Sequence, residues 1–465
     1  MCGAFFHSDF GRKNMAGARP ISGNNVALTV AKIRIIRYNM SQLTTITTIT
    51  MSKFHLFTVL ATVTAFTAFV NQAVFKLRGS LGMAVAGAAI SLGAFIVGLI
   101  WPEVTDKTEA LFASLNFTDT VFHGMLCFLL FAGAMHVDLR ALYRWKVTVA
   151  TLTTVGVLLS TLVVAFTSHL VSSLLGLDIS WPWLLVFGAL ISPTDPVAVL
   201  ALLRELKAPQ DLETKIAGES LLNDGTALVL FSVFLAMAVQ GEKASVATMG
   251  ILFAQKVFGG LLLGAVLGWL GHHMLRLVND APTAVVMTLT YALGGYTLGE
   301  ALHVSGPLVA AVMGLMVGSG RHSSMAESTQ AKLLPFWEMF DELLNMVLFL
   351  LVGLALIALP MSVSYALFGV AAILCALVGR YISVSLPLAL VAKAKSVTLP
   401  VGTVQAMVWG GVRGGISLAM VLSLPDFYHK QYLVWATWAV VMFSLLVQAP
   451  TMGKVLRHYG LIETK

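Results

Sequence analysis

The stretch SPTDP (residues 192–196) interrupts a long apolar run that begins near Trp181. Asp195 lies about 14 residues into this run, or about 21 Å along a helix that rises 1.5 Å per residue. The two prolines each remove a backbone donor and disfavour helical geometry in the residue before them. The sequence therefore predicts a membrane helix that unwinds at mid-depth and carries a carboxylate there.

Unwound backbone at this depth is tolerated only where it lines a protein-enclosed or aqueous cavity. Broken helices of this kind build cation sites in transporters, so we expect Thr194 and Asp195 to belong to an ion site. The alternative is a kinked structural helix whose aspartate is solvated.

The next apolar run contains GESLLNDGT (residues 218–226). Glu219 and Asn223 are four residues apart, as are Ser220 and Asp224, so all four project to one side of a helix. Hard oxygen ligands suit a small alkali cation, and a desolvated carboxylate can also hold a proton. A polar contact between helices is the alternative reading.

A third polar interruption is WGGVRGGIS (residues 409–417), in which four glycines surround Arg413. This span and the one around Asp195 run in opposite directions, which is typical of an inverted repeat with its site at the repeat interface. A buried arginine cannot lose its charge and needs an acid, and we predict that Arg413 pairs with Glu219. Arg380, in another apolar span, either extends to the membrane surface or pairs with a core acid.

The whole composition indicates a polytopic all-α membrane protein. Of the 465 residues 58% are hydrophobic and 11% charged, against about 25% charged in soluble domains. The net charge of +7 comes from short basic loops rather than a nucleic-acid surface. Three scattered cysteines predict neither disulfides nor a thiolate metal site. About 13 spans are expected, at residues 54–74, 80–101, 119–136, 147–173, 181–203, 214–239, 251–277, 283–301, 304–319, 335–359, 363–392, 400–424 and 432–452.

The loops alternate between basic and acidic or uncharged ones. With basic loops such as Arg140–Lys146 and Arg204–Lys207 in the cytoplasm, the first span starts outside and the C-terminus ends inside. Residues 1–50 conflict with this topology, because they are basic and would lie outside. We expect them to be a disordered or non-native extension before Met51, with an interfacial amphipathic segment as the alternative. Residues 51–456 would form the transmembrane domain and 457–465 a short cytoplasmic tail.

The three motifs, in this order, resemble those of the monovalent cation:proton antiporter family, which includes NhaP-type bacterial Na+/H+ exchangers. SGP (residues 305–307) and FW (residues 336–337) followed by Asn345 are similar too. The resemblance implies a dimerisation domain beside a core domain in which two crossed, broken helices hold the ion. It also implies a homodimer in a bacterial inner membrane.

The resemblance also assigns roles to the site residues. Asp224 would be the shared ligand of cation and proton, with Na+ held by Asp224, Thr194 and Ser220. Asp195 would compensate the half-helix dipoles, and Glu219 with Arg413 would brace the site. One departure is Ala132, where family members often carry glutamate.

The expected function is Na+/H+ exchange without an enzyme reaction, cofactor or nucleic acid, with Li+ and K+ left open as cations. Exchange should be electroneutral, because Asn223 has no titratable charge beside Asp224. A K+/H+ antiporter of the same fold is the alternative, and a channel or sensor on this fold is a further one. An intramembrane aspartyl protease is a distant alternative, because the flanks Thr-Asp-Pro and Asn-Asp-Gly do not match such enzymes.

Overall fold

The computed structural model describes residues 53–77, 79–98, 100–195, 197–240, 246–319, 327–360, 362–395 and 400–462. In these ranges all regular secondary structure is helical, as predicted. The chain divides into a unit Met1–His55 and a unit Leu56–Lys465, and the following description concerns the second. The prediction for residues 1–50 lies outside the described residues.

Helical segments lie at every one of the predicted spans. In chain order they are α2 (Lys53–Val70), η1 (Asn71–Phe75), α3 (Gly79–Gly98), α4 (Pro102–Ser114), α5 (Phe117–Asp119), η2 (Thr120–Met125), α6 (Leu126–Met135), α7 (Leu139–Arg144), α8 (Lys146–Thr151), η3 (Leu152–Gly156), α9 (Val157–Leu174), α10 (Trp181–Ile191), α11 (Val197–Glu205), α12 (Gln210–Gln240), α13 (Val246–Leu275), α14 (Ala281–Ala301), α15 (Gly306–Ser319), α16 (Glu327–Leu354), η6 (Ala355–Ala358), α17 (Val363–Lys395), α18 (Thr403–Trp409), α19 (Gly415–Leu422), α20 (Lys430–Phe443), η7 (Ser444–Gln448) and α21 (Ala449–His458).

Among the described residues, nine helices are long and apolar enough to cross a membrane. Both α10 and α15 are apolar but shorter, and the broken helices are split into halves. The predicted number of 13 spans therefore remains a prediction. Large apolar side chains such as Phe66, Leu262 and Val370 are more than 60% exposed, as expected where lipid rather than water surrounds the chain. The segment after Trp101, which the predicted spans 80–101 and 119–136 leave as a connection, instead contains helix α4.

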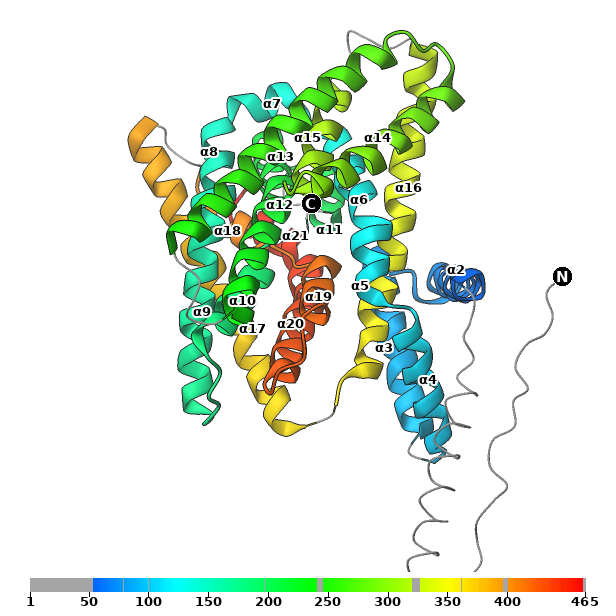
Figure 1. Cartoon of the computed structure of the whole chain (residues 1–465), viewed down its shortest axis with the longest axis vertical. Coiled ribbons are helices and arrows are strands. Elements are labelled where there is room, and N and C mark those ends of the chain that lie inside the picture. Colours follow the sequence, from blue (N-terminus) through cyan, green and yellow to red (C-terminus); the bar gives the residue numbers. More distant parts are fainter. Residues whose placement is uncertain are drawn as a thin grey trace, which may run out of the picture. The chain divides into compact units, whose positions relative to one another are not determined.

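The helices of this unit pack in two groups (Figure 1). In the first group α9 packs against α10 and α17, α17 against α20, and α10 against α12. In the second group α15 packs against α6, α13 and α14, and α3 packs along α16. The groups meet along α12 and α19 on one side and α6, α13, α15 and α16 on the other. The three predicted motifs all belong to the first group.

Two helices of the first group are interrupted, as the sequence predicted. The chain leaves α10 at Ile191 and becomes helical again at Val197, while α18 ends at Trp409 and α19 begins at Gly415. The two interruptions touch, because the backbone N–H of Asp195 donates to the carbonyl of Val412 at 2.7 Å. This bond ties the two non-helical segments together where the broken helices cross.

Candidate functional site

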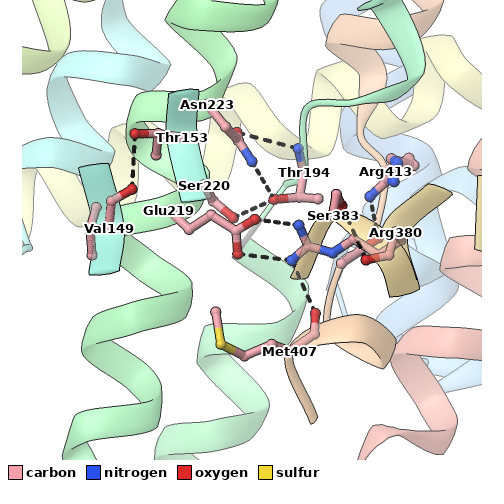
Figure 2. A network of polar contacts seen from close by, with 11 residues as sticks. Val149, Thr153, Thr194, Glu219, Ser220, Asn223, Arg380, Ser383, Met407 and Arg413 are labelled. Atoms are coloured by element: carbon pink, nitrogen blue, oxygen red, sulfur yellow. Dashed lines mark hydrogen bonds and ion pairs between the residues drawn. The ribbon is translucent and has the colours of Figure 1, made fainter. Parts of the chain in front are cut away.

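Three side chains, one from the first break and two from helix α12, form a hydrogen-bonded cluster beside the crossing (Figure 2). The hydroxyls of Thr194 and Ser220 lie 2.7 Å apart, and the amide of Asn223 donates to Thr194 Oγ1 at 2.9 Å. The backbone N–H of Thr194 donates to Asn223 Oδ1 at 3.4 Å. All three side chains are buried. The predicted grouping of Ser220 and Asn223 with Thr194 is therefore present, and α12 holds the first break in place.

Asp224 lies one residue beyond this cluster and is 7% exposed. Within the described chain no hydrogen bond or ion pair reaches its carboxylate. Leaving an ionised carboxylate buried and unpaired is costly, so such a group takes up a proton or a cation. This arrangement distinguishes Asp224 from Glu219, which lies on the same helix.

Asp195 lies at the N-terminal end of the half-helix α19. A Cβ atom built on Gly414, the residue that precedes α19, would stand only 2.8 Å from Asp195 Cβ. The positive end of a helix dipole favours a nearby carboxylate. This placement is compatible with the dipole-compensating role that the resemblance implies for Asp195.

The predicted pair between Glu219 and Arg413 is wrong, because Glu219 binds Arg380 instead (Figure 2). Arg380 donates to both carboxylate oxygens of Glu219, one of them at 2.9 Å through Nη2, and to the carbonyl of Met407 at 3.0 Å. Arg413 donates to the carbonyl of Gly411 at 2.7 Å within its own break. Arg380 belongs to the unbroken helix α17, and its side chain reaches Glu219 on α12.

A cavity of about 480 Å³ leads to the site. The α12 residues that line the cavity recur every three or four positions, so they lie on one face of the helix. The distance along the helix from the first of them to the last is about 21 Å. These residues are Gln210, Glu213, Thr214, Ala217, Ser220, Leu221 and Asp224. The cavity therefore begins among exposed loop residues and ends at Asp224.

The lining of this cavity is strongly acidic, although the whole chain carries a net positive charge. Arg204 is the one arginine in the lining, which contains no lysine, and it bonds to Glu213 at 2.7 Å. A cleft lined by one sign of charge concentrates ions of the other sign. The seven acidic residues of the lining are Asp138, Asp195, Glu213, Asp224, Glu338, Asp341 and Glu342.

A second cavity, of about 380 Å³, approaches α12 from the other end of the helix and is lined by Leu228 and Ser232. Apolar packing separates it from Asp224. Leu308 of α15 lies against Gly225, with no room for a side chain there, and forms a buried cluster with Val229 and Val257. Asp224 therefore faces the acidic cavity and does not line the second one.

Comparison with known proteins identifies the family of this chain. The family described as "Sodium/hydrogen exchanger, transmembrane" matches residues 91–458. The chain belongs to the sodium/hydrogen exchanger family. It is 36% identical over 406 residues to the Na+/H+ antiporter NhaP of Pseudomonas aeruginosa, covering 85% of this chain and 94% of the relative. It is 31% identical to the Na+/H+ antiporter NhaH of Halobacillus dabanensis, covering 80% and 92% of the two chains.

A solved structure of this family has the same fold. The sodium proton antiporter MjNhaP1 from Methanocaldococcus jannaschii matches with a TM-score of 0.65 at 17% identity, covering 86% of this chain and 96% of that one. The predicted family and antiporter fold, with several membrane-spanning helices, are therefore confirmed. Ala132, the position at which the resemblance led us to expect glutamate, is fully buried in α6 in an apolar cluster with Phe131 and Trp337 and does not line the acidic cavity.

Sequence reasoning missed two groups at the site. It left Arg380 open between the membrane surface and a core acid, and it gave Asp341 no role at the site. The sequence contained a signal for Asp341, because Asn345 and Leu348 follow it at helical spacing and therefore share its helix face. In the structure all three residues line the acidic cavity. This stripe shows that Asp341 faces the cavity.

Proposed function

We propose that this protein is a secondary transporter that exchanges Na+ for H+, with Asp224 as the carboxylate that both ions share. One observation carries the proposal: Asp224 is buried, unpaired within the described chain, and placed at the inner end of an acidic cavity. The relatives named as Na+/H+ antiporters support the choice of ions.

The chemistry follows from competition for one carboxylate. A proton neutralises Asp224 directly, whereas Na+ needs further oxygen ligands to replace its water. The hydroxyls of Thr194 and Ser220 are the candidate ligands, and Asn223 holds Thr194 in position. Asp195 adds negative charge at the crossing. Because one site holds either ion, filling it with one displaces the other.

Alternating access requires that Asp224 face one side of the membrane at a time. The acidic cavity opens where α11 ends and α12 begins, beside Arg204 and Lys207. The positive-inside rule favours this as the cytoplasmic side, and we infer an inward-facing state from it. We place the protein in a bacterial inner membrane as a homodimer, with the first span starting outside and the C-terminus in the cytoplasm.

The test is proton movement in everted membrane vesicles on addition of NaCl, followed with a pH-sensitive dye. In the parent, NaCl should dissipate the pH gradient, with a saturable dependence on the Na+ concentration. Asp224→Asn should abolish this response, because the amide cannot exchange a proton for a cation. Asp178→Asn is the matched control, since Asp178 is an exposed residue of the loop between α9 and α10. Saturable exchange in Asp224→Asn would refute the site.

Adding KCl or LiCl to the same vesicles distinguishes the alternatives. A response to K+ with none to Na+ would identify the K+/H+ antiporter. Cation flux without counterflow of protons would identify a channel.

A further inference from the structure

Asp341 lies on the wall of the acidic cavity that α16 provides, opposite the stripe of α12 that leads to Asp224. Three acidic residues of α16 line the cavity. Glu338 and Glu342 are exposed, whereas Asp341 is half-buried. Asp341 is thus the deepest carboxylate of α16 in this cavity.

The same face of α16 continues from Asp341 to the crossing of the broken helices. Asn345, one turn further on, is 5% exposed and donates from Nδ2 to the backbone carbonyl of Asp341 at 2.9 Å. Leu348, on the next turn, packs against Gly415 at the start of α19. Asp341 therefore shares one face of α16 with residues that reach the start of α19.

No described arginine, lysine or histidine forms an ion pair with Asp341. This separates it from Glu213 in the same lining, which is paired with Arg204. Asp224, at the end of the cavity, is buried and unpaired in the described chain as well. Two carboxylates without cationic partners therefore face one cavity from two helix groups, and such an arrangement is satisfied by a bound cation.

We propose that Asp341 is a second cation-binding carboxylate of the transporter, which holds the partly dehydrated cation on its way to Asp224 and sets the apparent affinity for it. The inference rests on the proposed function. A cation that moves down the cavity loses water, and carboxylate oxygens are the ligands that replace it. Asp341 belongs to α16, in the other helix group from Asp224, so it acts at the approach to the shared site and not as the proton-exchanging group.

The test compares Asp341→Asn with the parent in proteoliposomes, where Na+-dependent proton counterflow is measured over a range of Na+ concentrations. We expect the KM for Na+ to rise roughly tenfold, which corresponds to about 1.4 kcal/mol of lost cation binding, while the maximal rate stays within about twofold of the parent. Asp341→Glu, which retains the charge, should recover most of the affinity.

Glu342→Gln is the matched control, because Glu342 is the exposed neighbour on the same helix and lines the same cavity. It should change KM much less than Asp341→Asn does. Equal rises in KM for both variants, disappearing at high ionic strength, would show only general attraction by the acidic lining and would overturn the proposal. An unchanged KM in Asp341→Asn would overturn it as well.

If Asp341→Asn does not fold, Asp341→Ser can be compared with Asp341→Glu instead. The uncharged serine variant should then have the higher KM for Na+. Failure of the proposed function is distinguishable, because the parent itself would then show no Na+-driven proton movement. If the parent exchanges and Asp224→Asn is silent, a normal KM in the Asp341 variants rejects this inference alone.

Discussion

At the scale of single residues, the core of the first helix group buries two arginines and pairs only one of them with an acid. Arg380 and Arg413 are 5% and 2% exposed, and Glu219, at 2%, is bound to Arg380. A guanidinium cannot lose its proton to escape burial. Arg413 is held instead by the carbonyl of Gly411, which becomes available because the helix is broken there. The unwound backbone thus supplies an acceptor for Arg413 as well as part of the proposed ion site.

Removing the partner of Arg380 should unfold the protein readily. We expect Glu219→Ala to cost about 3–5 kcal/mol, because a buried guanidinium would be left without its carboxylate. The measurement is thermal melting of the detergent-purified protein. A double-mutant cycle provides the control: Glu219→Ala and Arg380→Ala should be strongly coupled, whereas Glu219→Ala and Arg413→Ala should be coupled less, because these two side chains share no hydrogen bond. Strong coupling in the second cycle would contradict the pairing seen here.

At the scale of elements, the site depends on how closely the two breaks approach each other. The bond from the Asp195 N–H to the Val412 carbonyl joins them, and Gly414 leaves room for the Asp195 side chain. The uninterrupted helix α12 then closes the site from the side through Ser220 and Asn223. The backbone groups left free by the two breaks therefore find hydrogen-bond partners in each other and in the side chains of α12.

Adding one methyl group at the crossing should impair exchange. In Gly414→Ala the new Cβ would lie 2.8 Å from Asp195 Cβ, so Asp195 or the start of α19 must shift. We expect the vesicle exchange rate to fall by roughly tenfold or more, since displacements of about 1 Å at a functional site have effects larger than this. Gly294→Ala is the control, because nothing lies within 4 Å of a Cβ built there. Normal exchange by Gly414→Ala would show that the close approach is unimportant.

At the scale of the whole molecule, the two helix groups meet around the buried carboxylate of Asp224. The acidic cavity reaches Asp224 from one side, while Leu308, Val229 and Val257 close the path from the other. A movement between the groups that opened the second path and closed the first would carry the bound ion across. Asn223, hydrogen-bonded to Thr194, adds no charge to what is carried.

Transport should therefore be insensitive to the membrane potential. In the proposed exchange one Na+ replaces one H+ at Asp224, and neutral Asn223 beside it leaves both half-cycles with the same charge. The measurement is exchange in proteoliposomes at fixed ion gradients while K+ and valinomycin clamp the potential at several values. A rate that changes strongly with potential would overturn the one-for-one stoichiometry. An imposed pH gradient should still drive Na+ uptake in the same vesicles.

Much of the fold could be predicted because membrane helices are a local property of the chain. Runs of apolar residues long enough to cross the bilayer fix the spans, and the prolines and glycines around Asp195 and Arg413 fix the two breaks. Helical spacing alone also placed Ser220, Asn223 and Asp224 on the polar part of one helix. These predictions needed no knowledge of which helices are neighbours.

The partner of each buried charge could not be predicted in the same way. Both arginines lie within apolar spans, and nothing in their flanks distinguishes the one that reaches Glu219. The packing of α17 against α9 and α18 brings Arg380 to that carboxylate. The position of α16 makes Asp341 face the acidic cavity. The sequence by itself determined the spans, the breaks and the ionisable groups, because these depend on neighbours along the chain. Only the tertiary structure decided the pairs and the cavity, because contacts between distant helices are set by how their faces pack.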